Sequence, residues 1–361
     1  MASLRRGARH LPDHGGRSGL TAAVTRNRAV LARQLLLERA ALPLTGVLEQ
    51  MGGLQAQYAP SMYVGLWSRL AGFARNDLTR ALERREVVQG TLLRATIHLV
   101  SAADYWPFAV AVGEARRRWW LTVRKDVTAA DMERAAAEVG AAVADGPRSR
   151  RDLEPLVPPR MIEGVHLWLD IVRVPPGGTW ERRRADVYAD ARQWLGPPRV
   201  DPDDAIDHVV RRYLGGFGPA TAKEISLWAG LSVATVRASL DRLPTHETTA
   251  DDGRNVVDLD GLGVAWTPPA DAPAPVRFLP TWDAALLAHA RAAEIIAEEH
   301  RPLVFTSKNP QSVGTFLVDG VVAGTWRLAN GVVHTDPFVS LGRRAMGEVA
   351  AEATRLSAFM V

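Results

Sequence analysis

The sequence of 361 residues contains no cysteine, only three lysines and no apolar run long enough to span a membrane. Without cysteine, the chain can form no disulfide, no zinc–thiolate site and no thiol nucleophile. Because Lys125, Lys223 and Lys308 are the only lysines, few amines are present for Schiff-base chemistry. No apolar stretch typical of a signal peptide follows the start, so we expect a cytoplasmic protein.

The basic residues are almost all arginines, although the net charge is only +4. The planar guanidinium group matches phosphate oxygens and base edges, so this composition favours a nucleic-acid partner. The nine histidines are scattered, and Pro12 interrupts the single H-x-x-x-H pair, His10 and His14. We therefore expect no metal site and no cofactor.

Turn residues and hydrophobic periodicity divide the chain into five parts. They are a basic tail over residues 1–21, three winged helices over 22–120, 121–198 and 199–267, and a β-rich C-terminal domain over 268–361. The expected fold class is α+β. Winged helices bind nucleic acid in many proteins and serve as protein-interaction or structural modules in others, so the outline alone leaves these roles open.

The first winged helix is predicted from helical segments followed by a strand–turn–strand unit. The helices are expected over 26–38, 44–51, 61–70 and 77–84, the last with Asn76 as its N-cap, and the two strands within 87–100. Ser101 to Asp104 has the pattern of a capping box that opens the next helix.

The remaining parts are predicted in the same way. The second winged helix is expected to have helices over 131–144, 149–157, 159–165 and 188–195 and a wing formed by 167–174 and 179–181. The third is expected to have helices over 202–214, 222–229 and 233–243 and a wing over 251–262. The C-terminal domain is expected to have a helix over 284–300, a hairpin turning at Asp319-Gly320, a strand over 332–339 and a helix over 344–360.

Two glutamines, Gln55 and Gln57, follow a glycine pair and precede Pro60. The glycines and the proline interrupt a helix, and in an extended segment side chains at i and i+2 face the same way. Two neutral amides on one face can hold a water, a sugar or a base edge, but neither can act as an acid or a base near neutral pH. Chemistry at this pair must rely on positioning. Taken alone, the two residues are also typical of the polar end of a helix.

Several arginines are candidates for contacts with DNA phosphates. They are Arg116, Arg117 and Arg118 beside two tryptophans, Arg182 and Arg183 after the second wing, and Arg237 on the expected recognition helix of the third unit. For the first group, a solvated helix face with buried tryptophans is an equally good interpretation.

Four groups of motifs occur in one order along the chain. They are Gly53-Leu54-Gln55-Ala56-Gln57, Arg94-Ala95-Thr96-Ile97-His98-Leu99, Gly218-Pro219-Ala220-Thr221 with Trp228-Ala229-Gly230, and Leu317-Val318-Asp319-Gly320 with Gly324-Thr325-Trp326. Together they resemble the AlkZ/YcaQ-type winged-helix DNA glycosylases over residues 22–361. The resemblance implies a C-shaped protein with three tandem winged helices and a β-rich C-terminal domain.

The same resemblance implies an activity. The family excises alkylated purines and unhooks interstrand crosslinks, and Gln55 and Gln57 match its catalytic motif. Gln57 places the chain in the AlkZ branch, since the YcaQ branch has Asp there. The implied function is that of a DNA glycosylase giving self-resistance to a DNA-alkylating antibiotic such as azinomycin B, and the scarcity of lysines predicts that it is monofunctional. The implied partner is double-stranded DNA with alkylated or crosslinked purines, bound by a monomer.

Further DNA contacts are implied by position in the family pattern. A hairpin near the C-terminus is thought to enter the minor groove, and we match it to residues 308–314, with Lys308, Asn309 and Gln311 as its contacts. Arg94 and His98 are placed near DNA as well, although by residue type both are typical of structural positions. Two alternatives stay open: a winged-helix transcriptional regulator without catalysis, and a resistance protein that sequesters free toxin.

Overall fold

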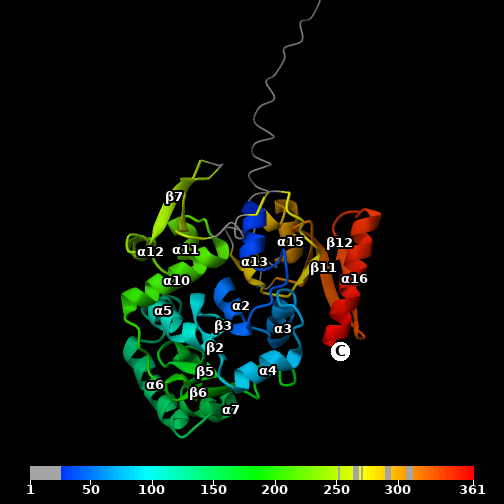
Figure 1. Cartoon of the computed structure of the whole chain (residues 1–361). Coiled ribbons are helices and arrows are strands. Elements are labelled where there is room, and N and C mark those ends of the chain that lie inside the picture. The colour runs from blue at the N-terminus through cyan, green and yellow to red at the C-terminus, as the bar shows by residue number, and fades with distance from the viewer. Residues whose placement is uncertain (1–25, 251–252, 263–267, 270, 289–293, 306–311) are drawn as a thin grey trace, which may run out of the picture.

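The computed structural model describes residues 26–250, 253–262, 268–269, 271–288, 294–305 and 312–361. Across these residues helices and strands are mixed, as the fold class predicts, and the strands form three sheets (Figure 1). None of the helices in the described ranges is both long and apolar enough to cross a bilayer. The basic tail, His10, His14, Lys308, Asn309 and Gln311 lie outside the described residues.

The first part of the chain contains the segments that carry the two glutamines. After a helix over residues 26–33, its elements are α2 (Leu44–Met51), β1 (Leu54–Gln55), α3 (Ala59–Trp67), α4 (Arg75–Glu83), β2 (Val87–Thr91), η1 (Leu93–Ala95), β3 (Ile97–Ser101) and α5 (Ala102–Val123). The hairpin β2–β3 and the N-cap of α5 at Ser101 confirm two predictions.

The next part is built from shorter elements. They are α6 (Ala129–Ala144), β4 (Arg148–Ser149), α7 (Arg150–Leu153), η2 (Glu154–Leu156), α8 (Pro159–Ile162), η3 (Val165–Leu167), β5 (Ile171–Arg173), β6 (Val187–Asp190) and α9 (Ala191–Leu195). One six-stranded sheet in the order β1-β3-β2-β5-β6-β4 joins this part to the first, because β2 pairs with β5. The boundary expected at residue 120 falls within α5, so the first two units share both a sheet and a helix.

The third part has the predicted helix-turn-helix. Its elements are α10 (Pro202–Phe217), α11 (Ala222–Ala229), α12 (Val233–Leu240), β7 (Thr245–Thr249) and β8 (Asn255–Leu259). Gly230 closes α11 with φ = 75°, a left-handed conformation that glycine adopts at no steric cost. Helix α10 lies against α5 and α2, so one core is continuous from the glutamine segment to the helix-turn-helix (Figure 1).

The C-terminal part is a four-stranded sheet with helices beside it. Its elements are β9 (Arg277–Leu279), α13 (Ala284–Leu287), η5 (Glu298–His300), α15 (Arg301–Val304), β10 (Thr315–Val318), β11 (Val321–Ala329), β12 (Val332–Pro337) and α16 (Arg343–Met360). The order β12-β11-β10-β9 includes the predicted hairpin at Asp319-Gly320. This sheet and α16 lie on the opposite side of the molecule from α12 and β7 (Figure 1).

Several local predictions are wrong. The return strand of the second wing is β6, not residues 179–181, and the helix expected over 188–195 begins only at Ala191. The cause is Asp190, which ends the strand and caps α9 by accepting hydrogen bonds from the amides of Arg192 and Gln193.

Other helices differ from prediction at their ends. The helix expected over 284–300 stops at Leu287, because Ala288 leaves the helical region. The first helix ends at residue 33 rather than 38, before Leu35 at φ = 56°. Ala74 rather than Asn76 is the N-cap of α4, and the Asp77 carboxylate accepts the Ala74 amide.

Two buried ion pairs connect distant parts of the chain. Arg69, after α3, donates to both oxygens of Asp283, just before α13, at 2.8 Å each, and both side chains are fully buried. Arg33, at the end of the first helix, donates to Asp258 of β8 at 2.9 and 2.6 Å. These pairs fix the C-terminal and third parts against the segments that flank the glutamines.

We expect Asp283→Asn to lower the free energy of unfolding by about 3–5 kcal/mol, since it leaves the Arg69 guanidinium buried without its counter-ion. The asparagine keeps the shape of the residue and a side-chain oxygen for capping α13. Urea denaturation measures the change. Glu114→Gln is the matched control, because Glu114 pairs with Arg118 in solvent and should change stability little. Equal effects of the two substitutions would contradict this role of the buried pair.

Candidate active site

The glutamine segment is extended, as predicted. Strand β1 pairs with β3 in the register Leu54↔Leu99 and Gln55↔His98, and the Ala56 amide donates to the Ile97 carbonyl. Leu54 and Ala56 are buried, whereas Gln55 is half-buried and Gln57 is exposed. The two glutamine side chains therefore alternate with core residues and lie on the outward side of the segment.

Glycines 52 and 53 make this arrangement possible. Their φ values of 72° and 82° lie in the left-handed region, and a Cβ on Gly53 would approach Val100 Cγ1 to 2.9 Å. Pro60 lies in the first turn of α3, where its missing amide proton is not needed. Helix α2 therefore ends before Gly52, and α3 begins only after Gln57.

Gln57 is held by the backbone of the neighbouring strand. Its Oε1 accepts a hydrogen bond from the Ile97 amide at 2.9 Å. This bond restricts the side-chain rotamer and leaves the second lone pair of the oxygen for another donor. A water or a sugar hydroxyl could fill that place without moving the residue.

Arg94 connects Gln55 to the helix-turn-helix of the third part. It lies in η1 with φ = 51°, its Nη1 donates to the Trp228 carbonyl at the end of α11, and its Nη2 lies 3.5 Å from Gln55 Oε1. Burial lowers the pKa of Arg94 to about 10, so the side chain remains a cation at neutral pH. A left-handed conformation at a residue other than glycine costs energy and persists where the surroundings fix it, here the contacts on both sides.

His98 faces Gln55 across β1 and β3 but is buried. Its Nδ1 lies 3.0 Å from the Thr96 carbonyl, so the proton is placed on Nδ1 and Nε2 keeps the lone pair. Burial, assisted by the charge of Arg94 and opposed by the Thr96 hydrogen bond, lowers the pKa of His98 to about 3. The imidazole is therefore neutral at physiological pH and is a weak base.

The arginine cluster of α5 does not form one surface. Arg116 is buried, and its guanidinium donates to the Thr91 carbonyl and to Asp170. It lies on one helical stripe with Val112 and Trp120, an i, i+4, i+8 spacing that could have indicated burial from the sequence. The expected contact of Arg116 with DNA is corrected to a structural role, since the guanidinium is enclosed by protein.

Arg117 and Arg118 are exposed on α5. Arg117 donates through Nε to the Leu167 carbonyl at 3.0 Å, and Arg118 pairs with Glu114 at 2.7 Å. Their contact with DNA stays a prediction.

The remaining arginine candidates lie on two separate elements. Arg182 is exposed and pairs with Asp186 at 3.0 Å, and Arg237 is exposed on α12. Arg183 is different, because its Nη1 lies 3.2 Å from the hydroxyl of Tyr58, the residue after Gln57. The structure thus brings Gln55, Gln57, Arg94 and His98 to one region and connects Arg183 to it only through Tyr58.

Two participants were missed by sequence reasoning. The Trp228 carbonyl holds Arg94, and the Ile97 amide holds Gln57. Both are backbone groups, which any residue type provides, and the first lies 134 residues from its partner. These residues lie in the motifs that carry the family resemblance, but no pattern of residue types shows that the motifs are in contact.

A family model described as DNA glycosylase AlkZ-like matches residues 48–359. The chain belongs to the AlkZ-like DNA glycosylases. It is therefore an enzyme that removes bases from DNA, which answers the alternative of a regulator without catalysis.

Two relatives are similar along nearly the whole chain. The interstrand DNA cross-link repair glycosylase of Streptomyces sahachiroi is 24% identical over 365 residues, covering 91% of this chain and 93% of that protein. The solved structure of the Streptomyces sahachiroi DNA glycosylase AlkZ matches with a TM-score of 0.78 at 20% identity, covering 93% of this chain and 96% of that chain. The AlkZ fold expected from the sequence is thus confirmed.

We expect the excision rate of this AlkZ-like glycosylase to be constant between about pH 5 and pH 9, because the glutamines do not titrate in that range. His98, with its pKa lowered to about 3, stays neutral throughout, and Arg94, with its pKa at about 10, stays charged. The rate should fall as the pH drops toward 3 and as it rises through 10. Single-turnover assays with a no-enzyme blank at each pH measure the profile, and a step centred near pH 6 or 7 would contradict it.

Proposed function

We propose that this glycosylase hydrolyses the N-glycosidic bond of cationic N7-alkylated purines in double-stranded DNA, acting as a monomer and unhooking interstrand crosslinks. The observation that supports this proposal most directly is the extended pair Gln55 and Gln57 beside a neutral histidine, His98. The name of the Streptomyces sahachiroi relative supports the crosslink as a substrate. The biological role we propose is self-resistance to a DNA-alkylating antibiotic such as azinomycin B.

The chemistry of the lesion fits a site without a strong base. A purine alkylated at N7 carries a positive charge, so the base leaves as a neutral molecule and the bond to C1′ is already weakened. The sugar becomes an oxocarbenium ion, water adds to C1′, and the added water releases one proton to solvent. The enzyme then has to place a water and stabilise developing positive charge, which carbonyl oxygens can do.

The two amides have different parts in this proposal. Gln57 Oε1 is fixed by the Ile97 amide and accepts a hydrogen bond from the attacking water with its second lone pair. Gln55 Oε1 lies 3.5 Å from Arg94 Nη2, and the extended backbone places Gln55 on the same outward face as Gln57. Because Gln57 is the more exposed and the more firmly held, we assign it the larger share of the rate.

Gln57→Ala should lower the single-turnover rate of N7-methylguanine excision by about a hundredfold or more, as the loss of one positioned hydrogen-bonding group does in other active sites. Gln193→Ala is the matched control, since Gln193 is an exposed glutamine whose side chain donates to the Ala144 carbonyl. Excision by Gln57→Ala at the rate of the control variant would refute the role of Gln57.

We expect the product to be an intact abasic site, because a glycosylase with lyase activity needs an amine to form a Schiff base. Lys125 and Lys223 are distant from the glutamines in the sequence, and Lys308 lies outside the described residues. Borohydride reduction during the reaction should trap no protein–DNA adduct. A trapped adduct that disappears in Lys308→Ala would show a bifunctional enzyme instead.

A further inference from the structure

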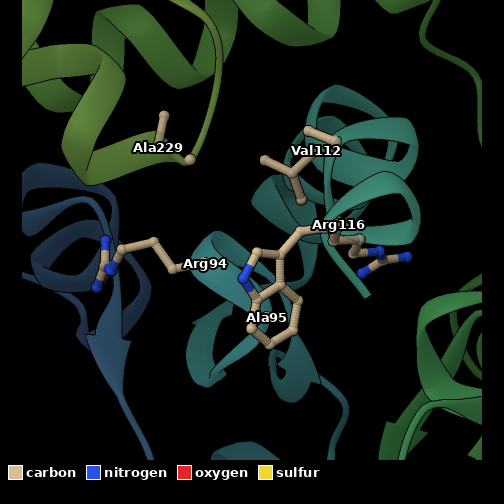
Figure 2. A pocket seen from close by; sticks show the side chains of 8 residues that line it. Arg94, Ala95, Val112, Arg116 and Ala229 are labelled. Carbon is tan, nitrogen blue, oxygen red and sulfur yellow. The ribbon is translucent and has the colours of Figure 1, made fainter. Parts of the chain in front are cut away.

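A hollow of about 250 Å³ lies between α5, η1 and the end of α11. Val112, Ala115 and Trp119 of α5 line it together with Ala229 and Gly230 at the end of α11. Figure 2 shows Val112 and Ala229 on different elements around it. Trp119 is 49% exposed, so part of its indole is open to solvent.

Small residues create this space. Ala95, Ala115, Ala229 and Gly230 make up half of its lining. Gly230 at φ = 75° and Ala95 at φ = 56° are in the left-handed region, which disfavours larger side chains, whereas Ala115 and Ala229 lie in helices and are not restricted in this way. A larger side chain at Ala115, which is half-buried, could project into the hollow without entering the core.

The polar side chains at the rim are turned elsewhere. Arg94 reaches the Trp228 carbonyl and Gln55, and Arg116 reaches the Thr91 carbonyl and Asp170. Figure 2 shows the two guanidinium groups pointing away from each other, on opposite sides of the hollow. The residues that line the hollow provide no side-chain acceptor, and apart from the two arginines their one side-chain donor is the Trp119 indole N–H, so an extruded nucleobase placed here would find few partners for its hydrogen-bonding edge. The occupant that fits is planar and apolar.

The hollow adjoins the reacting centre through one side chain. Arg94 lines it and places Nη2 3.5 Å from Gln55 Oε1. A group covalently attached to a purine whose sugar lies at Gln55 and Gln57 could therefore extend past Arg94 into this space. A volume of about 250 Å³ accommodates two or three fused aromatic rings but not a folded peptide segment.

We infer that this hollow is a subsite for a planar aromatic substituent carried on N7 of the alkylated purine, stacked on Trp119. The inference rests on the proposed function and extends it from small alkyl lesions to bulky aromatic ones. Burial of the rings and stacking on the indole stabilise the complex, and neither interaction acts on a methyl adduct. Trp119 and Ala115 then determine specificity rather than rate.

The test compares two duplexes that differ only in the N7 substituent of one guanine, a methyl group or a naphthylmethyl group. Ala115→Leu fills the hollow, and Trp119→Ala removes the stacking surface. Each should weaken binding and single-turnover excision of the naphthylmethyl adduct by about tenfold or more while changing the methyl adduct less than about twofold. Ala137→Leu is the control, because Ala137 is an exposed helical alanine on α6 that does not line the hollow.

Each outcome has one meaning. Equal losses on both duplexes would overturn the subsite, because they would show a base pocket or a structural role. Unchanged binding and excision of the aromatic adduct by both variants would overturn it as well. Failure of the unaltered enzyme to excise either adduct would refute the proposed function, while a preference for binding the aromatic duplex that Ala115→Leu abolishes would still support the subsite.

Discussion

The antiparallel pairing of β1 with β3 is the interaction on which the site depends. It is only two residues long, yet it fixes Gln55 opposite His98 and brings the Ile97 amide within reach of Gln57. A slip of one residue would turn Leu54 and Ala56 outward and bury both amides. The left-handed glycines before the strand and the proline after it prevent the helix that would otherwise run through this segment.

Burial then sets the electrostatic character of the site. His98 is kept neutral and Arg94 is kept charged, so the region contains amides, a neutral imidazole and a cation. Such a set is poorly suited to removing a proton from a strong O–H bond. It is well suited to a reaction in which the leaving group already carries positive charge and only a water must be placed. Arg94 contacts Gln55 and also donates to the Trp228 carbonyl, so the helix-turn-helix helps to hold Gln55 in place.

The sequence was sufficient for the features that depend on local rules. The extended glutamine segment follows from Gly52, Gly53 and Pro60, and the helix-turn-helix follows from the capping residues and Gly230. The hairpin at Asp319-Gly320 follows from a turn with both residues at positive φ.

Features that depend on tertiary contacts could not be predicted in this way. Strand β6 exists because β4 and β5 pair with it, and its own residues also suit a helix. The contact of Arg94 with α11 uses a backbone carbonyl and leaves no trace in residue type. Arg116 shows a different limit. The basic cluster suggested an exposed, DNA-contacting surface, but the helical spacing places Arg116 in the core.

The central claim is that two neutral amides suffice because the substrate brings its own positive charge. The most direct measurement is single-turnover excision from two duplexes of identical sequence, one with N7-methylguanine and one with uracil, a neutral base, at the same position. The account predicts rapid release of N7-methylguanine and no release of uracil above the no-enzyme blank. Release of uracil at a comparable rate would contradict it, because an uncharged base leaves as an anion that must take up a proton, and Gln55 and Gln57 have no proton to transfer.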